Sequence, residues 1–194
     1  MPATAVSSWF GQDFTQLHPL LQQLHLDGGT LSGTVELDLA AGFAGWVGRR
    51  LAAKLGIPSE SGSYPFEVHI EHRQGQLLWS RLFAQSHAML SVFEPVGSHA
   101  SGYWREVTGA TELHLQVDIQ DGGWHWRCVG MHLHGVPLPL WLAPRTRAYK
   151  EVEGGAYRFY VGFSLPLLGT VLSYSGLLQA ELLNANPALL AGAQ

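Results

Sequence analysis

Residues 131–144 read MHLHGVPLPLWLAP, and the rest of the chain can be arranged around this stretch. It carries three prolines and one glycine, yet it also contains large apolar side chains such as Leu138 and Trp141. Because each proline lacks an N–H group and fixes φ, the segment should run extended and form few ladder hydrogen bonds. We expect a segment this apolar to be buried, as a wall or rim against a core that strands on both sides supply.

The composition indicates a single domain with much buried or apolar surface. A chain of 194 residues can bury roughly 70% of the surface that its unfolded form exposes. Hydrophobic residues make up 46% of the chain and charged residues only 13%, well below the roughly 25% of an average soluble domain. This low charge favours either an apolar binding site or a large β core. We expect one domain over residues 1–194, with a core at about 10–178 and a tail at 179–194.

Charge and cysteine usage narrow the classes of partner. The net charge is −4, and the 11 Lys and Arg residues are scattered, whereas a phosphate-binding face needs clustered cations. The single cysteine, Cys128, excludes an intrachain disulfide and fits a reducing compartment. The sequence shows no secretory signal and no run of about 18 apolar residues. We therefore expect a cytoplasmic protein with no nucleic-acid partner and no membrane span.

Two segments near the N-terminus show the spacing of amphipathic helices. The first is an apolar stripe at positions 10, 14, 17, 21 and 24, with Pro19 inside it. Because proline is tolerated only in a first helical turn, the main helix should begin near His18 and end at Asp27-Gly28-Gly29, with the preceding turn a separate piece. The second helix is expected from Phe43 to Leu55, before the stop signal of residues 56–58.

Most of the remaining chain alternates with the period of β-strands. The clearest segments are 30–39 and 111–119, where apolar residues alternate with polar ones. Tight-turn signals occur at Gln74-Gly75 and at residues 121–123. Further strands are expected from Tyr64 to the first of these turns and at 76–83, 88–96, 102–107, 124–134, 145–153, 156–165 and 170–178.

These elements predict an α+β domain in which two N-terminal helices pack on a long, strongly curved antiparallel sheet or open β-barrel of about nine strands. So many sequential strands cannot remain one flat sheet without exposing unpaired edges, and curling the sheet removes that liability. Barrels and deeply curved sheets of this size hold either a packed interior or one small ligand.

The candidate binding residues are an arginine and a set of aromatic side chains on the strands. Trp79, Arg81 and Phe83 share one face of a strand, where an inward arginine would be costly unless it meets a carboxylate of the protein or of a ligand. We therefore hypothesise that a small apolar or amphipathic molecule binds in the concavity. In one form of this hypothesis the molecule carries an acidic group. Arg81 would be its anchor, and the walls would be Trp79, Phe83, Trp124, Trp126 and Trp141.

A histidine-dependent enzyme is the competing hypothesis, because ten histidines are many for this length. On the strand at 124–134, simple alternation puts His132 and His134 on the face of the tryptophans, and an H-x-H pair can chelate zinc. No third ligand lies near in the sequence, so we expect no metal and no cofactor. Glu67, His69 and Glu71 should share a solvent face, but would suit acid–base chemistry if that face lined a cavity.

Several segments together resemble a known family. They are FTQLHPLLQ (14–22), WSRLF (79–83), GVPLP through LAP (135–144), and LPLLG followed by YSG (165–169 and 174–176). In this order, over nearly the whole chain, they are similar to the bacterial domain of unknown function 4166. The resemblance implies a single bacterial, cytoplasmic domain and no known activity. Since the family also occurs behind a saccharopine-dehydrogenase-like reductase domain, it implies a reductase partner, and hence a third hypothesis of an interaction module with an exposed aromatic patch.

Overall fold

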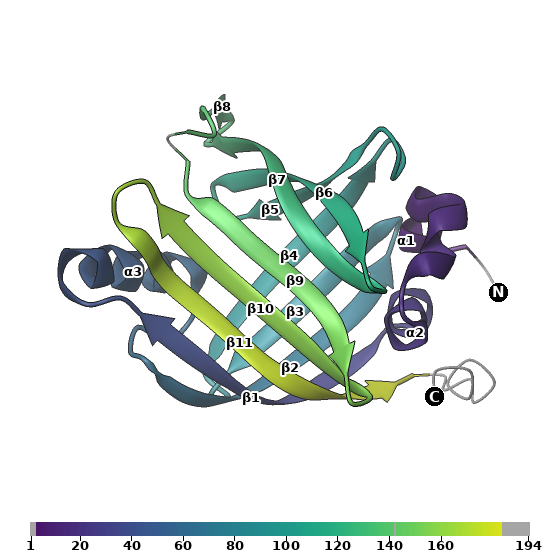
Figure 1. Cartoon of the computed structure of the whole chain (residues 1–194), viewed down its shortest axis with the longest axis horizontal. Helices are drawn as coiled ribbons and strands as arrows, with labels where there is room; N and C mark the ends of the chain where they lie inside the picture. The colour runs from purple at the N-terminus through teal and green to yellow at the C-terminus, as the bar shows by residue number, and fades with distance from the viewer. Residues whose placement is uncertain (1–2, 142, 184–194) are drawn as a thin grey trace.

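A closed antiparallel β-barrel forms most of the molecule in the computed structural model, which describes residues 3–141 and 143–183 (Figure 1). The barrel strands are β1 (Gly29–Leu39), β2 (Gly62–Arg73), β3 (Gln76–Phe83), β4 (His87–Val96), β5 (Tyr103–Thr108), β6 (Thr111–Gln120), β7 (Gly123–Leu133), β9 (Arg145–Glu153), β10 (Ala156–Leu165) and β11 (Gly169–Leu182). A two-residue strand, β8 (Val136–Pro137), pairs only with β7.

The order of the strands explains the closure. Sequential hairpins run from β1 to β7, and β9, β10 and β11 return to β1. Pairing of β6 with β7 and of β7 with β9 then joins the two ends of the sheet. The predicted α+β class and curved antiparallel sheet are confirmed, but the barrel is closed and has ten strands. Closure leaves every barrel strand with two neighbours.

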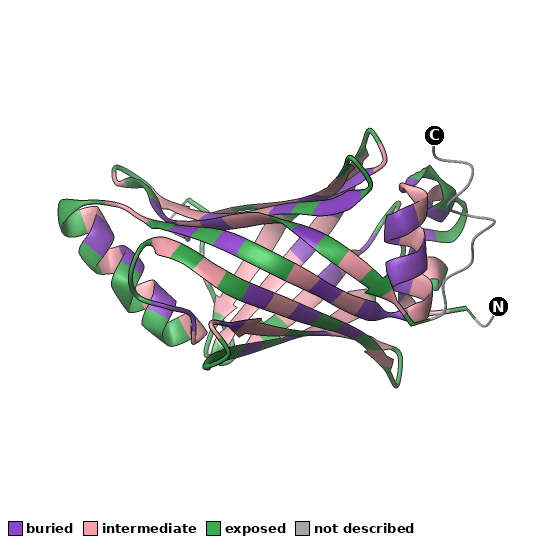
Figure 2. Ribbon diagram, turned by 90° about the horizontal axis from the view of Figure 1, so that it is seen from below, coloured by how far each residue is buried: buried purple, intermediate pink, exposed green. Residues whose placement is uncertain are grey.

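Alternation along the strands separates the lumen from the outer surface. On β1, Leu31, Val35 and Leu37 are buried, while Thr34, Glu36 and Asp38 point outward and are exposed. Figure 2 shows the same interchange of buried and exposed residues along the strands of the barrel wall. The period of two read from the sequence therefore identified the inward face here.

Two helices and a 3-10 turn close one end of the barrel (Figure 1). They are α1 (Ala5–Phe10), η1 (Gly11–Gln16) and α2 (Pro19–Asp27). As predicted, α2 begins after His18, whose Nδ1 accepts a hydrogen bond from the Leu20 amide at 3.2 Å. The short helix α1 was not predicted, because six residues are too few to show a helical period. A capping box between Thr4 and Ser7 stabilises its start.

These N-terminal elements are anchored to the strands and fill that end with aromatic side chains. Trp9 Nε1 donates to the Val96 carbonyl at 3.2 Å, and the His18 amide donates to the Gly122 carbonyl at 2.9 Å. The Phe10 ring lies 4.8 Å from the ring of Trp124. This end of the barrel is therefore a packed core, and any open space must lie toward the other end.

The other end is partly covered by α3 (Gly42–Leu55), which packs mainly against β11 (Figure 1). The sequence predicted this helix and its stop at Gly56, which has the left-handed conformation of a helix cap. Gly48 lies on the packed face, where a Cβ atom would be only 2.1 Å from the Val171 carbonyl oxygen. Glycine at this position lets the helix approach the strand.

The proline-rich stretch is a rim element, but the expectation that it is buried was wrong. Val136 is 61% exposed and Trp141 is 74% exposed. The Ala143 amide bonds to the Pro139 carbonyl at 3.1 Å, which closes a turn and places Trp141 at its solvent-facing tip. The prolines remove the ladder donors that would have held the segment against the wall. Leu142 lies outside the described residues, as do residues 184–194 of the predicted tail, whose first part instead extends β11.

Strand β7 contains a bulge that changes which residues face inward. Leu115 pairs with Cys128 and His114 with Gly130, so Val129 has no partner on β6. The extra residue reverses the alternation beyond it. His132 consequently points outward, opposite Glu112, and the prediction that it shares a face with the tryptophans was wrong.

The described helices are all too short or too polar to cross a membrane.

We expect Gly48→Ala to lower the free energy of unfolding by about 1–3 kcal/mol, because the added methyl group must displace the Val171 backbone. In an ordinary helix interior the same change stabilises by up to about 1 kcal/mol. Urea denaturation of this variant and of Ala53→Gly, an exposed control in the same helix, separates packing from helix propensity. A Gly48→Ala variant at least as stable as the parent would contradict the close approach.

Candidate functional site

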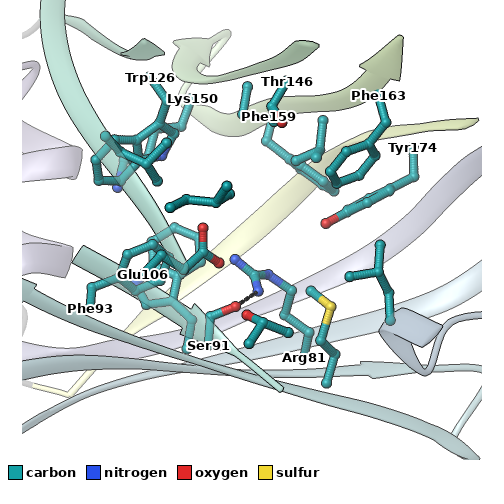
Figure 3. A pocket seen from close by; sticks show the side chains of 18 of the residues that line it. Arg81, Ser91, Phe93, Glu106, Trp126, Thr146, Lys150, Phe159, Phe163 and Tyr174 are labelled. Atoms are coloured by element: carbon teal, nitrogen blue, oxygen red, sulfur yellow. Dashed lines mark hydrogen bonds between the residues drawn. The ribbon is translucent and has the colours of Figure 1, made fainter. Parts of the chain in front are cut away.

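A cavity of about 160 Å³ occupies the part of the barrel that the N-terminal plug does not fill. It runs from the aromatic rings above α2 toward α3, where Leu51 and Leu55 contribute to its outer end. Its walls are mostly apolar side chains from β2, β3, β4, β6, β7, β9, β10 and β11. Figure 3 shows Phe93, Trp126, Phe159 and Phe163 around this space.

Polar groups converge in the middle of the cavity. Arg81 on β3 donates from Nη1 to the hydroxyl of Ser91 on β4 at 2.8 Å. The carboxyl group of Glu106 on β5 points toward them in Figure 3, where the dashed line joins Arg81 to Ser91. Within residues 3–141 and 143–183, Arg81 has no carboxylate oxygen within 4 Å, so its attraction to Glu106 acts at longer range.

The surroundings of these groups disfavour charge. Burial raises the pKa of Glu106 above its usual range, although Arg81 and the hydrogen bond from Ser91 act in the opposite direction. Burial likewise raises the pKa of Tyr157 and of Tyr174, both of which line the cavity. The Tyr157 hydroxyl and the Trp79 indole N–H are buried and have no hydrogen-bond partner in the described part of the chain. The cavity thus combines apolar walls with unsatisfied polar groups.

Lys150 lies at the inner end of the cavity, where β9 meets α2. It is 2% exposed, and its Nζ is 2.6 Å from Nε2 of His25. The same Nζ lies 3.6 Å from the ring centroid of Trp124 and 4.5 Å from that of Trp79. Burial first, and then repulsion from Arg81, lowers the pKa of Lys150 well below its usual range. Burial also lowers the pKa of His25 well below its usual range.

The residues predicted as a site occupy three different places. Arg81, Trp79 and Trp126 line the cavity. Phe83 and Trp124 are fully buried behind its surface: Phe83 packs on Phe66, and Trp124 lies under Lys150. Trp141 does not line this cavity. It is 74% exposed and lines a second hollow at the rim, together with Trp126 and Pro144, which line both spaces.

Sequence reasoning missed Ser91, Glu106 and Lys150. A signal for Glu106 was present, since it alternates with Trp104 and Thr108 on β5 and so shares their inward face. Lys150 lies at alternate positions with Thr146 and Ala148 on β9, so the three side chains point to the same, inward side of the strand. Arg81 has a large aromatic residue two positions away on each side, whereas Lys150 has Ala148 and Val152 at those positions, so the sequence signal for Lys150 is weaker.

A second group of polar residues meets on the outside of the barrel. Oε1 of Glu112 is 2.8 Å from Nε2 of His114 and 3.9 Å from Nδ1 of His132, and the three ligand atoms all lie within 4.8 Å of one another. Oε2 of the same carboxylate accepts from Arg105 at 3.5 Å. By contrast, Glu67, His69 and Glu71 lie on the solvent face of β2, as the preferred reading of their alternation predicted.

Fold and site together define a class: a closed, ten-stranded antiparallel barrel with an internal apolar cavity that holds an arginine and a carboxyl group. Residues 17–178 match the model of the family described as Domain of unknown function (DUF4166), and the chain belongs to that family. The match covers α2, α3 and nearly the whole barrel, so the resemblance found in the sequence is confirmed. Comparison with the curated proteins gave no match.

We expect Glu106→Gln to change the pH dependence of stability. Because the folded chain holds the Glu106 proton more tightly than the unfolded chain, that stabilisation is complete below the ordinary pKa of 4.5 and is lost as the pH rises through the higher folded-state pKa. The stability of the variant relative to the parent should therefore increase over that window and then level off.

Urea denaturation at a series of pH values from acid to neutral measures this difference. The matched control is Glu71→Gln on the solvent face of β2, which should follow the parent within about 0.5 kcal/mol at each pH. A constant difference between Glu106→Gln and the parent across the series would show that folding does not perturb this carboxyl group.

Proposed function

We propose that this domain binds one small amphipathic molecule with an acidic head group inside the barrel, with Arg81 as its anchor. The observation that carries the proposal is an arginine in an apolar cavity whose one close hydrogen bond, within the described chain, goes to a neutral hydroxyl. Arg81 is only partly exposed, and a guanidinium held among apolar side chains without a close anion is costly. A ligand carboxylate would supply that anion.

The chemistry of arginine favours a carboxylate over other acceptors. A guanidinium has five N–H donors in a planar fork that matches the two oxygens of a carboxylate, and the bond to Ser91 uses one of them. Glu106 attracts Arg81 only at longer range. Because burial favours its neutral form, Glu106 can in addition donate a hydrogen bond to the bound head group. Both groups then recognise the same anion.

The side chains of the cavity wall determine the size and the apolar character of the rest of the ligand. Phe93, Phe159 and Trp126 surround the polar group with ring faces and edges, which suits an aliphatic chain or a single ring. Apolar cavities of about 150 Å³ accept a benzene-sized molecule. The cavity of about 160 Å³ therefore supports an acid with a single ring, or a medium-chain aliphatic acid such as octanoate whose chain extends toward α3.

A second candidate function, metal binding, is supported by the outer group of Glu112, His114 and His132. Two imidazoles and a carboxylate are common zinc ligands, and three protein ligands leave one coordination position open. Nδ1 of His132 is buried without a hydrogen-bond partner in the described chain, and Arg105 holds the far oxygen of Glu112, as residues behind metal ligands commonly do. A zinc ion would take the place of the hydrogen bond between His114 and Glu112.

We expect Arg81→Met to weaken binding of octanoate at least tenfold and to change binding of octanol less than threefold, because only the acid needs the guanidinium. Isothermal titration calorimetry, supported by the fluorescence of the cavity tryptophans Trp79 and Trp126, measures both affinities. Arg127→Met is the matched control, since Arg127 is exposed on the outer surface.

If Arg81→Met is poorly folded, the double variant Arg81→Met/Glu106→Gln tests the same point, because it replaces the guanidinium and the carboxyl group that attract each other at the same time. It should bind octanol and lose octanoate. Equal octanoate affinity in either folded variant and the parent, or no octanoate binding by the parent, would overturn the proposal.

For the metal site, we expect chelator-treated protein to bind one Zn²⁺ per chain, and His114→Ala or His132→Ala to weaken that binding at least tenfold. His134→Ala is the control, because His134 is an exposed neighbour outside the group. Zinc titration followed by calorimetry gives the affinities. Unchanged zinc affinity in the double variant His114→Ala/His132→Ala would exclude this site.

A further inference from the structure

Lys150 is a buried amine without an acidic partner. Its side chain is 2% exposed, and no carboxylate oxygen lies within 4 Å of its Nζ in residues 3–141 and 143–183. Its one close polar contact is Nε2 of His25, at 2.6 Å. Burying a lysine in this way costs several kcal/mol if the ammonium is kept, so the neutral amine is the favoured form.

Three tryptophans surround this amine. Nζ lies 3.6, 4.5 and 5.7 Å from the ring centroids of Trp124, Trp79 and Trp126. The rings exclude water, and Arg81 adds repulsion, so the pKa of Lys150 falls well below its usual range. A neutral amine keeps its lone pair for a nucleophilic attack, as in lysines that form Schiff bases.

The amine also lies at the end of the cavity that an entering ligand would reach last. Lys150 lies beside Trp126 at the inner end of the cavity (Figure 3). Leu51 and Leu55 of α3, which covers the other end of the barrel in Figure 1, also line the cavity. A molecule that enters from the α3 end with its polar group first would pass Phe163 and Phe159, then the Arg81 group, and reach Lys150 last. Lys150 at the closed end can therefore react only with molecules that fit into the cavity.

We propose that Lys150 anchors a carbonyl ligand, an aliphatic aldehyde small enough for the cavity, as an imine. The proposal rests on the proposed function, because it uses the same cavity, but it needs neither Arg81 nor an acidic ligand. It assigns to the barrel a covalent mode of binding besides the non-covalent one.

The chemistry balances with the groups present. The Nζ lone pair attacks the carbonyl carbon, a C–N bond forms, and the C=O electron pair moves to oxygen. Nε2 of His25, 2.6 Å away, takes a proton from nitrogen and returns one to oxygen, giving a carbinolamine. The hydroxyl then leaves as water, taking up the last N–H proton of the nitrogen by way of Nε2 of His25, while the nitrogen electron pair forms C=N and leaves the neutral imine. Amine and aldehyde are consumed, water is released, and no oxidant or reductant is needed.

The lysine content of the chain makes the proposal easy to test. Lys54 and Lys150 are the only lysines in the sequence. Lys54 is exposed on α3, so it reports the reactivity of an ordinary lysine in the same molecule. Any modification can therefore be assigned by the masses of three peptides, those with Lys54, Lys150 and the N-terminal amine.

The experiment treats the whole chain with limiting octanal and sodium cyanoborohydride, which reduces an imine to a stable secondary amine. Intact mass spectrometry and peptide mapping follow the product. We expect one octyl group per chain, on Lys150, at a rate at least tenfold above that of Lys54. Lys54→Met should keep this modification, and Lys150→Met should lose it. Octyl groups only on Lys54 or the N-terminal amine would overturn the proposal.

Measuring octanoate binding as well distinguishes failure of the imine proposal from failure of the proposed function. Lys54→Met should retain octanoate affinity within threefold. A circular dichroism spectrum and a thermal unfolding curve like those of the parent show that Lys150→Met is folded. Parent protein that binds octanoate but is not modified at Lys150 would overturn the imine and leave the proposed function intact. Parent protein that binds neither octanoate nor octanal would overturn both. Modification at Lys150 without octanoate binding would overturn the acidic ligand and support the imine.

Discussion

Pairing of β6 with β7 is the interaction on which the rest of the structure depends. It joins the two ends of a ten-stranded sheet, so that every long strand has hydrogen-bonded neighbours on both sides. The number of strands then sets the interior width. About eight strands give a lumen that side chains just fill, and the diameter grows with strand number. A ten-stranded barrel therefore has more interior space than its own strand residues can occupy.

The chain fills that space unevenly. At one end α1, η1 and α2 insert Trp9, Phe10 and neighbouring apolar side chains, which pack on Trp104 and Trp124. At the other end α3 lies against β11 and covers part of the opening. The difference between a packed end and a partly covered end leaves the cavity between them. Its position follows from the helices, and its shape follows from the strands.

Low polarity gives the few charged groups in the lumen their properties. Arg81, Glu106 and Lys150 come from three strands and affect one another over distances longer than a close ion pair. Among these apolar walls, burial favours the neutral forms of Glu106 and Lys150. The outer group of Glu112 and the histidines belongs to a different environment, because adjacent residues of β6 point to opposite sides of the wall.

The sequence by itself determined the two main helices, the strand positions, the antiparallel order and the inward arginine, because local periodicity and proline or glycine positions specify these. Only the tertiary structure decided closure, since pairing of β6 with β7 and β9 depends on contacts remote in sequence. It also decided the fate of His132 and Trp141. One unpaired residue, Val129, reverses the side-chain phase of β7, and a turn at Pro139 carries Trp141 into solvent. Neither the bulge nor the turn changes the alternation of apolar and polar residues along the sequence. A bulge can be recognised only from the pairing with the partner strand.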